Sequence, residues 1–278
     1  MRLACSGIAW DVTEDELISK LLQRYGVDAV DIVPGKYFPD PAAATDESIA
    51  RVRNWWSDRG FDITGMQALL FGTTGLNVFG SIDSQHTMLK QLEAVCRIGA
   101  GLSATRIVFG SPKNRDRNGL NDQEAMDIAV PFFQRLGNIA QSFDVTICLE
   151  PNPQCYGANF MTTSTETAKV VQQVAHHAIK MQFDTGAITI NNENPISVLQ
   201  EYAHLIGHVH ASEPDLLPLG DGETNHIMVA KALQQYLPRQ LISIEMLATK
   251  NESHAVSIER ALIVATQHYR TKEMKDNT

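Results

Sequence analysis

Short apolar runs alternate with longer amphipathic segments along the chain. The short runs are rich in Val, Ile and Leu, which is typical of buried strands, and the longer segments repeat apolar residues at helical spacing. We predict eight strands, at residues 3–9, 29–33, 62–69, 105–109, 145–150, 179–184, 206–210 and 241–245. We predict helices at residues 14–25, 46–59, 87–99, 122–142, 165–176, 196–204, 227–237 and 255–267.

Local signals mark several of these boundaries. Asp11 or Thr13 suits the N-cap of the first helix, and Asn225 suits the N-cap of the helix predicted to begin at residue 227. Gly26 and Gly60 directly follow helical segments, where a residue in the left-handed conformation commonly ends a helix. A polar segment, 271–278, follows the last predicted helix, and we expect it to fray.

The strand–helix alternation predicts the fold. Eight strand–helix pairs within 278 residues, with no Gly- or Pro-rich linker, favour a single (β/α)8 TIM barrel over residues 1–270, followed by a polar tail at 271–278. The alternative is a doubly wound open sheet, which commonly carries a glycine-rich phosphate loop after its first strand. Residues 5–9, Cys-Ser-Gly-Ile-Ala, do not form such a loop. We therefore favour the α/β barrel.

Each of the last four predicted strands ends in a residue that can bind a cation. Side chains alternate between the two faces of a strand, so Ile147 and Leu149 would face the helices and Glu150 the barrel axis. The same alternation turns the final residues of the next three strands inward; these are Asp184, His210 and Glu245. Barrel active sites lie at the C-terminal ends of the strands, so we expect these four side chains to meet there.

Three carboxylates and one imidazole suit a hard or borderline divalent cation. Such a set favours Mn²⁺, Mg²⁺ or Co²⁺, and Zn²⁺ is less favoured because no thiol takes part. A lone acid at a strand end is usually a cap or a surface charge, but burying several unpaired carboxylates together is costly. The sequence therefore predicts one divalent metal ion, Mn²⁺ before the others, held by Glu150, Asp184, His210 and Glu245.

Composition narrows the class of partner. The net charge of −9 argues against a nucleic-acid-binding surface, which needs clustered Lys and Arg. No apolar run approaches the length of a membrane span, and the four cysteines have no zinc-site or redox spacing. We expect a cytoplasmic protein that binds a small molecule and neither nucleic acid nor membrane. An exposed apolar helix face would support a homodimer or homotetramer.

Four segments at the ends of predicted strands five to eight resemble the xylose-isomerase-like TIM-barrel superfamily, and more closely its sugar phosphate isomerase/epimerase branch, which includes tagatose 3-epimerase-like enzymes. They are Leu149-Glu150-Pro151-Asn152-Pro153, Gln182-Phe183-Asp184-Thr185-Gly186, His208-Val209-His210-Ala211-Ser212 and Ser243-Ile244-Glu245. The resemblance covers nearly the whole chain. It implies the same metal site, with Glu150 and Glu245 as catalytic residues that move a proton through a metal-stabilised enediolate. The implied function is a metal-dependent isomerase or epimerase of a sugar, sugar phosphate or keto sugar.

The chain departs from the ketose 3-epimerase pattern at three positions. That group carries a histidine, a glutamate and an arginine where this chain has Ala187, Tyr156 and Leu216. Those side chains hold substrate hydroxyls, so the departures favour a differently shaped or modified substrate. They leave room for a metal-dependent lyase or dehydratase acting on an oxidised (keto) sugar or cyclitol. Metal-dependent cleavage of abasic DNA is a third possible function, but the net negative charge of the chain argues against it. A non-catalytic sugar-binding protein is the last alternative.

Six further residues are candidates for substrate binding; they are Gln67, Lys113, Asn152, Tyr156, His208 and Glu213. Gln67 is at an inward position of the third predicted strand. Lys113 belongs to a basic loop, 110–117, that suits a substrate phosphate or carboxylate and equally a solvated surface. His208 lies one layer deeper than His210, where it would reach the substrate or orient a metal ligand. Asn152, Tyr156 and Glu213 lie in loops beyond ligand strands, although Tyr156 also suits packing under its loop.

Overall fold

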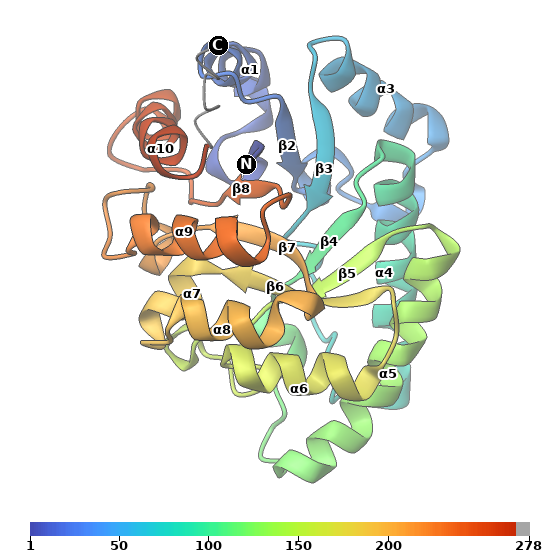
Figure 1. Ribbon diagram of the computed structural model, residues 1–278. Coiled ribbons are helices and arrows are strands. Elements are labelled where there is room, and N and C mark those ends of the chain that lie inside the picture. The colour runs from blue at the N-terminus through green and yellow to red at the C-terminus, as the bar shows by residue number, and fades with distance from the viewer. Residues whose placement is uncertain (271–278) are drawn as a thin grey trace.

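A computed structural model of the chain describes residues 1–270 and shows a closed barrel of eight parallel strands in chain order (Figure 1). The strands are β1 (Leu3–Ser6), β2 (Ala29–Ile32), β3 (Asp62–Met66), β4 (Arg106–Phe109), β5 (Thr146–Leu149), β6 (Ile179–Asp184), β7 (Ile206–Ala211) and β8 (Ile242–Ile244). β1 pairs with both β2 and β8, which closes the barrel. The predicted TIM barrel is confirmed. The predicted tail, 271–278, lies outside the described residues.

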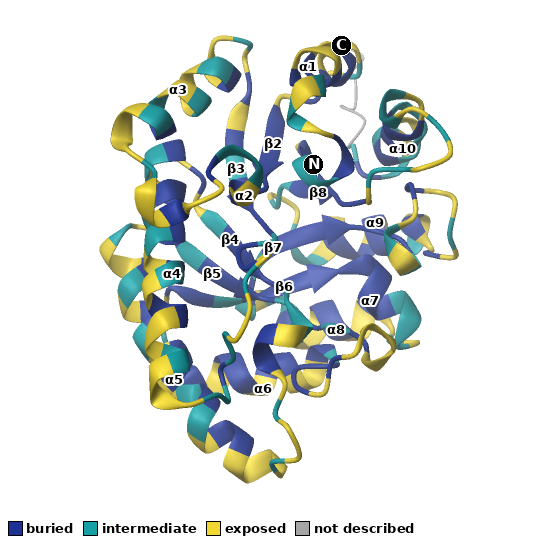
Figure 2. Ribbon diagram, turned by 180° about the vertical axis from the view of Figure 1, so that it is seen from behind, coloured by how far each residue is buried: buried dark blue, intermediate teal, exposed yellow. Residues whose placement is uncertain are grey.

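Helices cover the outside of the barrel and separate successive strands (Figure 1). They are α1 (Asp15–Arg24), α2 (Pro34–Tyr37), α3 (Asp46–Ser57), α4 (Ile82–Leu102), α5 (Asp122–Ser142), α6 (Ser164–Val174), α7 (Thr185–Ile190), α8 (Pro195–Tyr202), α9 (His226–Tyr236) and α10 (His254–His268). The strands are mostly buried, while the long helices bury one face and expose the other (Figure 2). Of the helices described, none is both long and apolar enough to cross a membrane.

The predicted boundary signals act as caps in the structure. Asp11 accepts from the backbone N of Thr13 at 2.9 Å, and Glu14 reaches back to the N of Asp11 at 3.1 Å, so a capping box opens a short 3₁₀ turn ahead of α1. Asn225 caps α9 by accepting from the N of Met228 at 3.0 Å. Gly26 and Gly60 have φ of +63° and +80°, the left-handed conformation that ends a helix without steric cost.

The main differences from prediction lie at the C-terminal ends of the strands, where the loops begin. β1 stops at Ser6 because Gly7–Ala9 form a 3₁₀ turn, and β3 stops at Met66 rather than at residue 69. Two short helices, α2 and α7, were not predicted, since four to six residues carry too little helical periodicity to stand out. α7 follows β6 without a loop, so the last residue of the strand also caps the helix.

The middle of the barrel is polar. Asp31, Gln182, His208 and Ser243 are all buried there, at 0–1% exposure. The β2–β3 ladder has a register shift between Val30 and Asp31, and an irregularity of this kind re-aims side chains. A Cβ on Gly65 of β3 would lie 2.7 Å from Oδ1 of Asp31, so only glycine leaves room for that carboxylate.

Candidate metal centre and its cavity

The structure brings together the four side chains predicted to bind a metal. Glu150 follows β5, Asp184 ends β6, His210 lies in β7 and Glu245 follows β8. One ligand atom from each lies within 4.8 Å of the others. His210 is fully buried, whereas the side chains of Glu150 and Glu245 are 12% and 9% exposed. The cluster is therefore closed off from the barrel interior and accessible from the face at which the strands end.

The nitrogen and oxygen atoms of these side chains lie close together, but several of them form no hydrogen bond. Nδ1 of His210 lies 3.1 Å from Oε2 of Glu245 and 3.4 Å from Oε1 of Glu150. Within residues 1–270, Oε1 of Glu150 and both ring nitrogens of His210 are buried and have no hydrogen-bond partner. A buried polar atom left in this state costs about 1–3 kcal/mol. Three carboxylates and an imidazole with unpartnered atoms facing one point fit a divalent cation.

The electrostatics of the cluster lead to the same conclusion. Burial, together with the charges of Glu245 and Glu150, raises the pKa of Asp184 to about 8. Burial alone would lower the pKa of His210, but the two glutamates raise it well above its ordinary value. The protein by itself must therefore hold protons here to balance the carboxylates. A bound cation would take over that role, since it supplies positive charge at the same point.

Glu245 is oriented from the far side of the barrel. Nε2 of Gln67 donates to Oε1 of Glu245 at 2.6 Å, and the hydroxyl of Ser6 donates to Oε1 of Gln67 at 2.5 Å. Because the amide oxygen is held by Ser6, its nitrogen must face the carboxylate. Gln67 was predicted to contact substrate, and the structure places it at the edge of the cavity as the partner of a ligand.

Arg115 supports Glu150 from a position that the sequence did not reveal. Although it belongs to the predicted basic loop, it is fully buried. Nη1 donates to the backbone carbonyl of Glu150 at 2.7 Å and Nη2 donates to Oδ1 of Asn152. The amide of Asn152 in turn lies 3.3 Å from Oε2 of Glu150. Gly110 completes this arrangement, because a Cβ there would lie 2.0 Å from Oε2 of Glu150.

Asp184 is fixed by the element that follows it. Oδ1 accepts from the backbone N of Ala187 at 2.6 Å, which makes Asp184 the N-cap of α7. Oδ2 accepts from the hydroxyl of Ser212 at 2.7 Å. Each carboxylate oxygen thus has one donor and keeps a lone pair for a cation.

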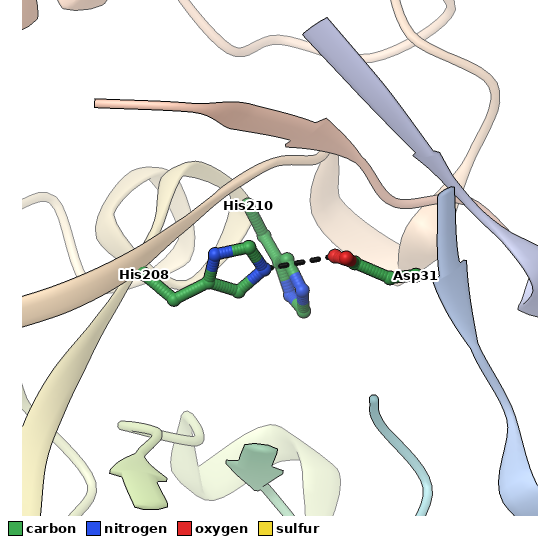
Figure 3. A group of neighbouring side chains, drawn as sticks. All are labelled: Asp31, His208 and His210. Atoms are coloured by element: carbon green, nitrogen blue, oxygen red, sulfur yellow. Dashed lines mark hydrogen bonds and ion pairs between the residues drawn. The ribbon is translucent and has the colours of Figure 1, made fainter. Parts of the chain in front are cut away.

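A buried aspartate–histidine pair lies next to His210 (Figure 3). Nε2 of His208 is 2.8 Å from Oδ2 of Asp31, and Thr64 donates to Oδ1 of Asp31 at 2.9 Å. The rings of His208 and His210 meet edge to face, with centroids 5.2 Å apart. Burial opposes the shift, but the histidine charges lower the pKa of Asp31 to about 2. Asp31, His208 and His210 also have cation-compatible spacing, yet Asp31 and His208 already satisfy each other.

Asp31 was missed by the sequence analysis. The signal available in the sequence is a charged residue within the apolar run Ala29–Ile32, because a carboxylate in a buried strand needs a partner inside the barrel. His208 precedes His210 by two residues on β7, and its ring faces Asp31 (Figure 3). It is not among the residues that line the cavity.

A cavity of about 270 Å³ opens beside the cluster, and its lining includes Glu150, Asp184 and Glu245. Four of the six predicted substrate residues line it; they are Gln67, Asn152, Tyr156 and Glu213. Lys113 is exposed on the 3₁₀ turn Pro112–Arg115 and is outside the lining, as is His208. The three positions of departure, Ala187, Tyr156 and Leu216, all face the cavity.

Two of the lining residues use their polar groups within the protein. The hydroxyl of Tyr156 accepts from the backbone N of Asp215 at 2.6 Å. The carboxylate of Glu213 accepts from the backbone N atoms of Gly220 and Thr224 at 2.8 and 2.9 Å, and lies 2.8 Å from Nε2 of His226. Glu213 therefore shapes the loops over the barrel, while Tyr156 is oriented by the backbone of Asp215 and keeps only its hydroxyl proton to donate.

Comparison with known proteins agrees with this architecture. The family model described as xylose isomerase-like TIM barrel matches residues 19–264. The solved D-psicose 3-epimerase from Clostridium cellulolyticum H10 superposes with a TM-score of 0.81 and 15% identity over 98% of this chain and 100% of that chain. The 3-keto-D-glucoside 4-epimerase from E. coli gives 0.77 and 15%, over 95% and 98%. At these identities the likeness establishes a shared fold.

A curated relative matches part of the sequence. Inosose dehydratase from Clostridium beijerinckii is 27% identical over 92 residues, which is 33% of this chain and 30% of that protein. The match therefore spans less than a third of the relative's length.

Proposed function

Because the chain belongs to the xylose isomerase-like TIM-barrel family, we propose that it is a metal-dependent isomerase or epimerase acting on a keto sugar or a related α-hydroxy carbonyl compound. The observation that carries the proposal is the cluster of three carboxylates and one imidazole beside the cavity, with buried donor atoms that lack partners. Such a cluster is costly to maintain without a ligand, and it lies where barrel enzymes perform their chemistry.

The proposed metal, Mn²⁺, would be held by Glu150, Asp184, His210 and Glu245. When bound, a divalent cation of this kind stabilises the negative charge of an enediolate. His210 is fully buried and is not part of the cavity lining, and both ring-facing glutamates and the capped carboxylate of Asp184 surround the same point, so the role of Asp184 and His210 is to hold the cation. Glu150 and Glu245 line the cavity and would also exchange protons with carbon.

The two glutamates are held in the same way. One oxygen of each accepts from a side-chain amide, of Asn152 for Glu150 and of Gln67 for Glu245, and the other oxygen lies 3.4 or 3.1 Å from Nδ1 of His210. We propose that both reach the reacting carbon. Removal on one side and return on the other would epimerise it, and return to the neighbouring carbon would interconvert aldose and ketose.

Solvent exchange tests the chemistry without requiring knowledge of the product. The protein loaded with Mn²⁺ should transfer deuterium from D₂O to the carbon next to the carbonyl of a suitable keto sugar. Glu150→Gln and Glu245→Gln should each abolish exchange, whereas Glu47→Gln, exposed on α3, serves as a matched control. Absence of exchange and of turnover across keto sugars, keto-inositols and their phosphates would contradict the proposal.

A lyase or dehydratase acting on a keto sugar or cyclitol is the second candidate. The partial match to inosose dehydratase favours it, and its first step is the same proton removal. The reactions diverge afterwards, because the lyase expels a β-substituent whereas the epimerase returns the proton. Product analysis with a 3-keto-glycoside separates them: loss of the leaving group indicates the lyase, and inversion indicates the epimerase.

A further inference from the structure

Part of the cavity lining is an apolar wall. We use that name for six of its lining residues; they are Ile8, Leu69, Leu70, Phe71, Tyr156 and Leu216. They come from four regions of the chain, which follow β1, β3, β5 and β7. The cavity volume of about 270 Å³ is near the lower end of small-molecule sites, so any bound ligand must contact this wall.

Polar side chains beside the wall are already engaged. Gln67 is held between Ser6 and Glu245, and Asn152 between Arg115 and Glu150. Tyr156 and Glu213 are bonded to the loops, as described above, and Ser111 adds one small polar residue to the lining. A fully hydroxylated substrate would therefore place hydroxyls against Leu70 or Leu216 without partners, which costs binding energy.

The charges of the lining favour an uncharged ligand. No Lys or Arg is among the described residues that line the cavity. The charged groups that face it are carboxylates, of which Glu150, Asp184 and Glu245 are committed to the metal centre. A phosphate would therefore find no cationic side chain in this lining to offset its charge.

Two wall loops hold unfavourable backbone conformations. Ala68 and Leu216 have φ of +55° and +52°, a region that residues other than glycine rarely adopt. Leu216 is kept there because Leu247 donates its N to the carbonyl of Leu216 at 2.9 Å and the neighbouring Asp215 is bonded to Tyr156. Phe71 is 85% exposed at the rim. The strained backbone of Ala68 and Leu216 and the exposed ring of Phe71 thus belong to the loops that form the wall, which is typical of ligand-binding loops.

We infer that the apolar wall is a subsite for an apolar substituent, and that the substrate is an uncharged keto sugar carrying an aryl or alkyl aglycone. This inference rests on the proposed function, because the metal centre is taken to hold the carbonyl end of the same molecule. Burial of the substituent against leucine and phenylalanine side chains would supply binding energy that the engaged polar groups cannot.

Matched glycosides test the subsite. We would measure Kd by calorimetry for phenyl 3-keto-β-D-glucoside and methyl 3-keto-β-D-glucoside with the Mn²⁺-loaded protein. The phenyl compound should bind about tenfold more tightly or better, from the additional apolar area buried. Equal affinities, tighter binding of the methyl compound or binding of neither would overturn the inference.

Variants in one loop localise the effect. Leu216→Asn should reduce the phenyl-to-methyl affinity ratio severalfold, and asparagine tolerates the left-handed backbone, so the loop should keep its shape. Leu217→Asn is the control, because Leu217 is adjacent, 42% exposed and outside the lining. An unchanged ratio in Leu216→Asn would count against the wall. Deuterium exchange is measured separately. If exchange occurs but the phenyl and methyl compounds bind equally, only the apolar subsite is refuted. If the phenyl compound binds more tightly but no exchange occurs, only the proposed chemistry is refuted.

Discussion

The amide nitrogen of Gln67 lies 2.6 Å from Oε1 of Glu245 and donates to it, although the two residues follow strands far apart in the chain. Ser6 fixes the amide by donating to its oxygen at 2.5 Å. The ends of β1, β3 and β8 are thereby linked around one ligand. This link leaves Oε2 of Glu245, 3.1 Å from His210, as the oxygen directed at the metal site.

Replacing Gln67 with alanine should slow deuterium exchange and weaken metal binding by roughly ten- to hundredfold, as loss of an outer partner of a metal ligand typically does. The physical reason is that Glu245 would lose the bond that orients it. Exchange rates and calorimetric Mn²⁺ affinity would measure this. Gln123→Ala, on the exposed start of α5, is the control, and equal behaviour of the two variants would contradict the assigned role.

Metal should stabilise the folded protein strongly. Divalent ion at about 100 times its Kd adds ~2.7 kcal/mol to the free energy of unfolding. For a chain of this size we expect the Tm to rise by roughly 5 °C or more, measured by thermal melting with Mn²⁺ and with chelator. Asp184→Asn should lose most of the rise. A Tm that is the same with ion and with chelator would argue against a metal centre.

Metal affinity should increase with pH. The pKa of Asp184 is raised from 3.8 to about 8, so between these values the folded, metal-free protein holds a proton that the unfolded chain has released. Stability of the metal-free protein should therefore fall as the pH rises through this window. Bound metal displaces the proton, so the affinity should rise about tenfold per pH unit for each proton released below pH 8. Calorimetry in buffers of different ionisation enthalpy would count these protons, and none released would refute the prediction.

Asp31 should be required for the metal centre even though it is not among the four clustered residues. In Asp31→Asn, His208 would lose a charged partner at 2.8 Å and the ring packed against His210 would be less firmly held. We expect metal affinity to fall about tenfold or more, with a lower Tm. Asp28→Asn is the control, because Asp28 pairs with Arg2 and its side chain is 57% exposed. A metal affinity equal to that of the control would show that the pair is only a packing feature.

Gly110 should not tolerate a side chain. A methyl group there would overlap Oε2 of Glu150, which a Cβ would approach to 2.0 Å. Gly110→Ala should displace Glu150 and reduce exchange by at least about tenfold, because small misplacement of a catalytic group is costly. Gly35→Ala has open space around the added Cβ and is the matched control. Full activity in Gly110→Ala would mean that Glu150 has another productive position.

Much of the candidate site could be predicted because its rules are local. Side chains alternate along a strand, and barrel strands end together at one face, so reading Glu150, Asp184, His210 and Glu245 as inward-facing strand ends was enough to place them in one cluster. Cap residues such as Asp11 and Asn225 follow the same principle, since each acts within one turn of its own position.

The sequence by itself determined the barrel, the face that carries the candidate site and the four residues that cluster there. Tertiary structure alone decided that Arg115 is a buried support rather than a solvated charge, that Asp31 pairs with His208, and that Tyr156 and Leu216 form part of an apolar wall. These outcomes depend on which loops meet across the barrel mouth and on how much water they exclude. Neither quantity is encoded in periodicity, because each arises from contacts between segments distant in the chain.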